Sequence, residues 1–248
     1  MVAQGKQGRT ISDDVDNLIA WWREAGVDTI VGDEPRSWLE EPKKPRTAPA
    51  ARGETPAPAP APALGDMPSD LAALRQWLLS SDALAAPAAD RLDAIGDPAG
   101  GLMILVDMPD QGDRDAGGLL SGEAGLLFDR MLAAIGRDRA STYIAPLSPA
   151  RIAGGAIDDN ALETLGTIAR HHVALAGPDR LLTMGDAPSR VFCGAGLDAS
   201  RGTQHIFNHD GGTVSVTATF HPRFLLRQPR FKAQSWKDLQ MLIEGMTA

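Results

Sequence analysis

The chain has 248 residues, of which 43% are hydrophobic, and 24 Lys and Arg residues face 32 Asp and Glu residues, which gives a formal net charge of −8. This length and apolar content allow one folded domain with extensions and exclude a wholly disordered chain. The single cysteine, Cys193, excludes a disulfide framework. We find neither an apolar run that could span a membrane nor an apolar signal segment, so we expect a cytoplasmic protein. The negative charge argues against a protein that coats nucleic acid over its whole surface, although a local basic site remains compatible with it.

The first part of the chain, residues 1–46, reads as a short helical segment. Ser12 followed by acidic residues is typical of a helix start, where carboxylates face the positive end of the helix dipole. A single amphipathic helix cannot bury its own apolar face. We therefore expect Trp21 and Trp22 either to anchor this segment on the main domain or to bind a protein partner.

Residues 47–66 form a linker rich in alanine and proline. From Thr47 to Ala63, 12 of 17 residues are Ala or Pro. Proline fixes the backbone dihedral φ and removes the N–H donor, so this stretch is incompatible with helix and sheet. The composition indicates a semi-rigid spacer, and the alternative is a docking site for a proline-reading partner.

The pattern of residues 67–248 alternates between helices and strands. Buried strands are indicated by short apolar runs, and helices by apolar residues recurring every three or four positions. Such alternation predicts an α/β domain, a three-layer α/β/α sandwich with a mostly parallel central sheet. We expect helices at 68–84, 122–135, 158–175, 187–193 and 228–246, and strands at 102–106, 142–144, 180–184 and 213–220.

Three strand ends carry residues suited to ligand binding, because ligands of open α/β sheets bind beyond the carboxyl ends of the strands. They are residues 107–113, 145–149 and 221–227. The last begins with His221, and five basic residues without any acid lie between Phe220 and Lys237. This basic stretch predicts a phosphate-binding surface. The alternative is a solvated basic helix that His221 merely caps.

The last of these stretches resembles the C-terminal motif of the family 4 uracil-DNA glycosylases. That motif reads His-Pro-small-Tyr-Leu-Leu-Arg, followed by a helix with Trp-x-Asp-Leu. The chain has His-Pro-Arg-Phe-Leu-Leu-Arg at 221–227 and Trp-Lys-Asp-Leu at 236–239. Residues 106–125 are similar to the family's first motif, with Pro109 and several glycines in register and Asp107 in place of a Glu. The resemblance implies a glycosylase fold and a DNA base flipped into a pocket for excision.

The resemblance also implies a role for two polar side chains. Asp107 would position water or stabilise an oxocarbenium-like sugar, and His221 would donate a hydrogen bond to an oxygen of the leaving base. The alternative for Asp107 is a loop carboxylate that accepts backbone N–H groups. The other residues implied are a base pocket of Pro109, Leu120 and Ala145, and DNA contacts from Arg223, Arg227, Arg230 and Lys232.

The chain departs from the family pattern inside the expected pocket. Leu120 stands where the family has a Phe that stacks on the base, and an aliphatic side chain supplies no aromatic stacking. Ala145 stands where the family has an Asn that reads the base edge, and alanine offers neither donor nor acceptor. Asp110 replaces a family Gly, and with Asp113 and Asp115 it makes the loop after the first strand acidic and therefore unfavourable to phosphate.

The family's iron–sulfur cluster also has no counterpart in this sequence. The four cysteine ligands would fall near Ser81, Leu84, Leu147 and Ala161, none of which is a cysteine. We therefore expect no metal or other cofactor bound by this chain. In place of the cluster we predict a small apolar cluster of Leu84, Leu147 and Ala161.

Three functions are consistent with these observations. The first is a uracil-DNA glycosylase-like hydrolase of base-excision DNA repair with an altered choice of base. The second is a catalytically inactive relative that acts as a DNA-binding or protein-docking module, with the N-terminal helix as the docking element. The third is binding of a free nucleobase or nucleotide. In each case we expect a monomer, with DNA as the partner in the first two.

Overall fold

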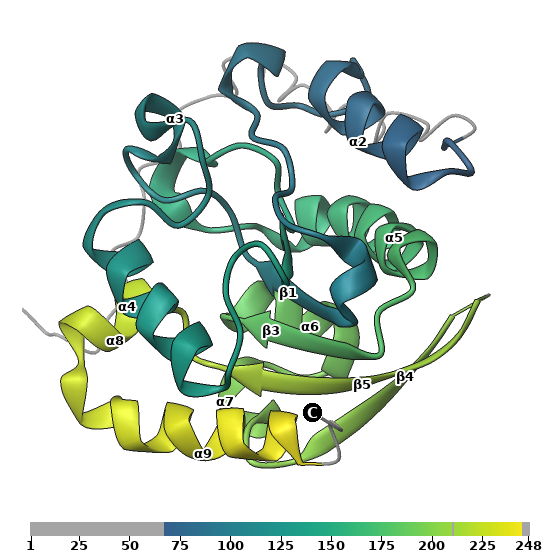
Figure 1. Ribbon diagram of the computed structural model, residues 1–248. Coiled ribbons are helices and arrows are strands. Elements are labelled where there is room, and N and C mark those ends of the chain that lie inside the picture. The colour runs from purple at the N-terminus through teal and green to yellow at the C-terminus, as the bar shows by residue number, and fades with distance from the viewer. Residues whose placement is uncertain (1–66, 210, 245–248) are drawn as a thin grey trace, which may run out of the picture. The chain divides into compact units, whose positions relative to one another are not determined.

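The computed structural model describes residues 67–209 and 211–244 (Figure 1). The expected helical segment 1–46 and linker 47–66 lie outside the described residues. Within the described residues no helix is both long enough and apolar enough to span a membrane.

A five-stranded sheet with the order β2-β1-β3-β5-β4 forms the centre of the domain. Four strands run parallel, while β4 pairs antiparallel with β5 as a long hairpin (Figure 1). Two neighbouring strands, β1 and β3, begin and end at the residues that the sequence predicts. The bounds are β1 Leu102–Val106, β2 Tyr143–Pro146, β3 Arg180–Met184, β4 Gln204–His209 and β5 Gly212–Thr219.

The edge strand β4 was not predicted from the sequence. Its residues alternate between exposed and half-buried, and Ile206 is 74% exposed. An edge strand that faces solvent carries polar residues instead of the continuous apolar run of a buried strand, so it gives little hydrophobic signal.

The helices follow the expected pattern over most of the domain. The expected helix 228–246 is found as α9 with narrower bounds, since a short 3₁₀ turn at Pro229–Phe231 precedes it, and the short helices α3, α7 and α8 were not predicted. Proline has no N–H to continue a helix and disfavours the α conformation of the residue before it. The bounds are α2 Leu71–Ser80, α3 Asp113–Ala116, α4 Gly122–Ala134, α5 Asp159–Ala176, α6 Asp186–Cys193, α7 Leu197–Ser200, α8 Pro222–Arg227 and α9 Lys232–Ile243.

Alternate residues of each strand bury into two separate cores. Met103 and Leu105 of β1 pack in the core with α5 and α6, whereas Ile104 and Val106 pack in the core with α4 and α9. This division follows from the two-residue repeat of side-chain direction along a strand. Helices therefore cover both faces of the sheet (Figure 1), and the three-layer α/β/α architecture is confirmed.

The strand order places a crevice at the end of β1. The chain runs from β1 outward to β2 and then returns to β3 on the other side of β1. Such a reversal opens a crevice beyond the carboxyl ends of the two central strands, where α/β proteins bind ligands. Asp107 and Gly185 are the first residues after β1 and β3, and a Cβ on Gly185 would lie 3.9 Å from the Asp107 carboxylate.

A buried ionic contact fixes α9 to the end of β5. The Asp238 carboxylate, 2% exposed, accepts hydrogen bonds from Arg201 at 2.8 Å and from the Thr219 hydroxyl at 2.9 Å. The Arg201 guanidinium lies 3.9 Å from the centre of the Phe220 ring. These contacts hold the strand end that immediately precedes His221.

The buried pair of Tyr143 and His172 makes the domain sensitive to acid. The Tyr143 hydroxyl lies 2.8 Å from His172 Nε2, and burial, followed by the positive charge of Arg75, lowers the pKa of His172 to about 4. The unfolded chain therefore takes up a proton near pH 6.5, while the folded protein resists it until about pH 4. Stability is thus fully present above the unfolded pKa and falls as the pH drops below it.

We predict that His172 alone lowers the free energy of unfolding by about 3 kcal/mol between pH 7 and pH 4. The check is urea unfolding at several pH values for the wild type and for His172→Gln, whose side chain does not titrate. A pH dependence of equal steepness in both proteins would contradict this assignment.

Candidate active site

The carboxyl ends of β1 and β5 bring together two side chains that the sequence marks as catalytic. Asp107 follows β1, and His221 stands just before α8. His221 Nε2 lies 3.9 Å from Asp107 Oδ1. The pair is largely enclosed, since the side chain of His221 is 4% exposed and that of Asp107 is 15% exposed.

His221 is a neutral hydrogen-bond donor in this arrangement. Its Nδ1 accepts the Arg223 backbone N–H at 3.2 Å, which assigns the ring proton to Nε2. Burial, and then the charge of Arg223, hold the pKa of His221 well below its ordinary value. The Nε2 atom is buried and has no hydrogen-bond partner among the described residues. His221 therefore does cap α8, as the alternative interpretation has it, and still presents an unused donor beside Asp107.

Asp107 is a partly buried carboxylate with a raised pKa. Burial raises the pKa most, the charge of Arg223 lowers it, and the nearby charge of Asp110 raises it further. Its Oδ1 accepts the Met108 backbone N–H at 2.9 Å, and its Oδ2 accepts from Arg223. Asp107 therefore also binds a backbone N–H, as the alternative interpretation expects, while its Oδ1 atom lies near His221.

Arg223 links the two loops of the site. Its guanidinium donates to Asp107 Oδ2 and, at 2.6 Å, to Asp110 Oδ1. The side chains of Arg223 and Asp110 are 25% and 12% exposed, and Asp110 Oδ2 is buried without a partner among the described residues. The residue expected to contact DNA therefore points inward and neutralises two carboxylates.

The other basic residues of this stretch point outward. Arg227, Arg230 and Lys232 are exposed, and none forms an ion pair within the part of the chain that the structure describes. Arg230 lies over the Phe231 ring at 4.9 Å from its centre. The basic stretch is therefore divided into one inward-facing guanidinium and an exposed cationic surface.

Asp113 organises the loop between β1 and α4. Its side chain is fully buried and accepts the backbone N–H groups of Asp110 at 2.7 Å, Leu120 at 2.9 Å and Ser121 at 2.7 Å. The expectation that Asp113 adds to an acidic loop surface is wrong, because its charge is directed into backbone amides. Removal of these bonds would release both ends of the loop together.

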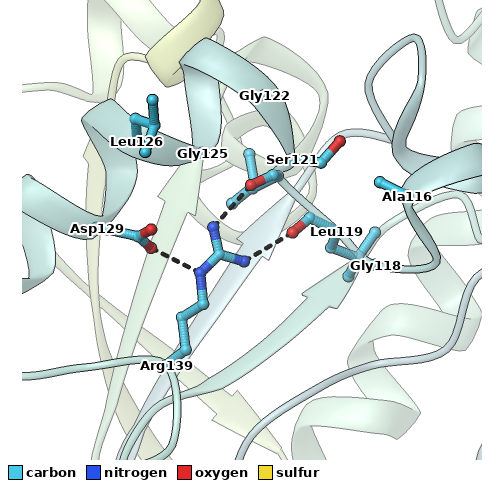
Figure 2. Close-up of a pocket in the computed structure, with 10 residues that line it drawn as sticks. Ala116, Gly118, Leu119, Ser121, Gly122, Gly125, Leu126, Asp129 and Arg139 are labelled. Atoms are coloured by element: carbon cyan, nitrogen blue, oxygen red, sulfur yellow. Dashed lines mark hydrogen bonds and ion pairs between the residues drawn. The ribbon is translucent and has the colours of Figure 1, made fainter.

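Leu120 is held in a left-handed backbone conformation with φ of 55°. Its N–H is bound by Asp113, and its carbonyl accepts from Arg139 at 2.7 Å, while Arg139 also binds Leu119 and Asp129 (Figure 2). A Cβ on Gly125 would lie 1.9 Å from the Leu120 carbonyl oxygen, so only glycine permits this close approach of α4. Such strain in a non-glycine residue is typical of binding and active sites.

The expected base-pocket residues Pro109, Leu120 and Ala145 are all buried. Ala145 belongs to the core on the α5 side of the sheet and Leu120 to the core on the α4 side, so the structure does not bring these two side chains together in one pocket. A cavity of about 250 Å³ beside α4 is lined by Leu120, and by Leu119 and Arg139, which are labelled in Figure 2. A larger cavity of about 630 Å³ is lined by Pro109 and Asp110, among others. Neither of these two cavities includes Asp107 or His221 in its lining.

The positions that resemble cluster ligands are filled by an apolar core and by one arginine. Leu84 and Leu147 belong to the core on the α5 side of the sheet and Ala161 packs against it, which confirms the expected apolar cluster. The buried Arg91 guanidinium donates to the carbonyl oxygens of the surrounding loop, at Leu78, Ser81, Leu84 and Ala86. These side chains offer no thiolate, so they do not fit an iron–sulfur cluster.

Comparison with known proteins identifies the family. The Uracil DNA glycosylase superfamily matches residues 94–240, which is more than half of the chain. The chain therefore belongs to the uracil DNA glycosylase superfamily, and this membership supports a uracil-DNA glycosylase-like function in general.

Sequence reasoning missed the inward orientation of Arg223 and the involvement of Asp110. A signal for both was present, because two aspartates close together at the end of a buried strand need a positive partner. The sequence contains several arginines, and hydrophobic periodicity alone does not show which of them pairs with these aspartates.

We predict that Arg223→Gln raises the pKa of Asp107 further, because it removes the positive charge that opposes burial. The pKa can be measured by NMR titration of the ¹³C-labelled carboxyl group. Arg151→Gln is the matched control, since Arg151 donates to the Pro109 carbonyl and not to a carboxylate. An unchanged or lowered Asp107 pKa in Arg223→Gln would contradict the assigned ion pair.

We predict that Arg91→Met destabilises the domain by about 2–4 kcal/mol, because several buried carbonyl groups lose their donor. The check is chemical unfolding at pH 7. Arg190→Met serves as control and should have little effect, because the Arg190–Asp159 pair is largely solvent-exposed. Equal stability of the two variants would show that the Arg91 hydrogen bonds are energetically minor.

Proposed function

We propose that the protein is a DNA glycosylase of base-excision repair that hydrolyses the N-glycosidic bond of a damaged base. The observation that carries the proposal is the neutral His221 donor 3.9 Å from the Asp107 carboxylate, at the ligand-binding edge of a uracil DNA glycosylase superfamily fold. Within the superfamily, the motifs at 106–125 and 221–239 resemble those of family 4.

The two side chains supply complementary chemistry. His221 Nε2–H donates to a carbonyl oxygen of the base and stabilises the negative charge that develops as the bond between C1′ and the base nitrogen breaks. Asp107 stabilises the positive charge that develops on the deoxyribose and orients the attacking water. The base departs as an anion with the electron pair of the broken bond and water adds to C1′; the proton that the water loses passes to the Asp107 carboxylate and then to the base anion.

The exposed cationic surface supports DNA as the substrate. Arg227 ends α8, Arg230 lies in the 3₁₀ turn Pro229–Phe231 and Lys232 begins α9, so all three follow His221 closely in the chain. Phosphate contacts there would orient a strand across the site without reading its sequence. Arg223 would reach a phosphate only in competition with Asp107 and Asp110, so we assign it first to orienting these carboxylates.

A second candidate function is a catalytically inactive DNA-binding or protein-docking module. The observation that favours it is the engagement of Asp107 Oδ2 by Arg223, which occupies one oxygen of the carboxylate. Neither Leu120 nor Ala145 carries a polar side-chain group that could read a base. In that case DNA binding would persist without cleavage.

The test is a glycosylase assay on single- and double-stranded oligonucleotides that carry uracil, hypoxanthine or xanthine, followed by alkaline cleavage at abasic sites. We predict that Asp107→Asn and His221→Gln each lower the cleavage rate by about 10²- to 10⁴-fold. Asp115→Asn, an exposed change in the same loop, is the control. Binding of all probes without cleavage by a large excess of wild-type protein would favour the inactive module.

A further inference from the structure

Two buried polar atoms of the site have no hydrogen-bond partner among the described residues: Asp110 Oδ2 and His221 Nε2. Buried polar groups without partners are costly, and at a candidate site they indicate where a ligand would form hydrogen bonds. The two residues are connected through Arg223, which binds Asp110 Oδ1 with its side chain and His221 Nδ1 with its backbone N–H.

The orientation of Asp110 is fixed from two sides. Its backbone N–H is bound by the buried Asp113 carboxylate at 2.7 Å, and its Oδ1 is held by the Arg223 guanidinium at 2.6 Å. Its second oxygen is therefore presented in a defined direction without its own partner. An ionised carboxylate only accepts hydrogen bonds, so this oxygen selects for a donor on the ligand.

Pro109 lines the cavity of about 630 Å³ together with Asp110, and its apolar side chain does not distinguish donors from acceptors. An N–H donor on His221 and an acceptor on Asp110 complement a ring that carries a carbonyl oxygen next to an N–H group.

We propose that Asp110 determines base specificity by accepting a hydrogen bond from a ring N–H of the flipped base, while His221 donates to the neighbouring carbonyl. This assignment rests on the proposed function. It defines the substrate class as bases with a carbonyl beside a ring N–H, such as uracil, hypoxanthine and xanthine. Cytosine would be rejected because its ring nitrogen at this place is an acceptor and would face the carboxylate.

The test compares uncleavable oligonucleotides in a fluorescence-anisotropy binding assay. One probe carries 2′-fluoro-2′-deoxyuridine and its partner carries the 3-deaza analogue, in which C–H replaces the ring N–H. A parallel pair carries hypoxanthine and 1-deazahypoxanthine on the same 2′-fluoro sugar. We expect the wild type to bind the N–H probe of at least one pair about 10- to 100-fold more tightly than its deaza partner. Asp110→Ala should reduce this ratio to about 1, and the control Glu163→Ala, an exposed change on α5, should leave it unchanged.

The outcomes separate this assignment from the proposed function. Equal wild-type binding of both probes in each pair overturns the role of Asp110, even if the wild type cleaves uracil-containing DNA, and this comparison needs no variant to fold. A ratio that survives in Asp110→Ala overturns it as well. Selective binding that is lost in Asp110→Ala, without cleavage by the wild type, supports Asp110 and rejects glycosylase activity.

Discussion

The site depends on a single electrostatic constraint: carboxylates buried at the end of a central strand need a positive partner. Arg223 provides it by binding Asp107 and Asp110 at once. Because Arg223 belongs to α8 and the aspartates follow β1, the same ion pairs join segments more than a hundred positions apart in the chain. The ion pairs of Arg223 therefore neutralise the carboxylates of the site and also join α8 to the end of β1. They help to position His221, because its Nδ1 accepts the Arg223 backbone N–H.

Loops around the site are held by charged side chains that bind backbone. In the loop between β1 and α4, the Asp113 carboxylate accepts hydrogen bonds from backbone N–H groups, and the Arg139 guanidinium donates to backbone carbonyl groups. Arg91 does the same for the loop after α2. A charged side chain that forms hydrogen bonds with several backbone groups can be buried without an oppositely charged partner. These hydrogen bonds also fix a loop whose backbone groups are not paired in a helix or sheet. This rigidity is what an enzyme needs where small displacements reduce the rate.

The sequence predicts the layers of the fold because buried parallel strands and amphipathic helices leave strong hydrophobic patterns, as in β1 and α5. It does not predict β4, whose exposed edge position removes that pattern, nor α8, whose six residues are too few to show a helical repeat. At the site, the meeting of Asp107 and His221 follows from parallel topology. The inward turn of Arg223 does not, because the direction of a long side chain depends on tertiary contacts that no local pattern encodes.

The left-handed backbone at Leu120 makes the conformation of the loop independent of the side chain that stands at this position. The strain at φ of 55° arises from the Cβ atom, which leucine shares with almost every other residue, and the loop path is fixed by Asp113 and Arg139 through the Leu120 N–H and carbonyl groups. The identity of the side chain is thus decoupled from the conformation of the loop. Evolution can exchange an aliphatic for an aromatic wall at this position without rebuilding the backbone, and the selectivity of the pocket can drift while its architecture stays constant.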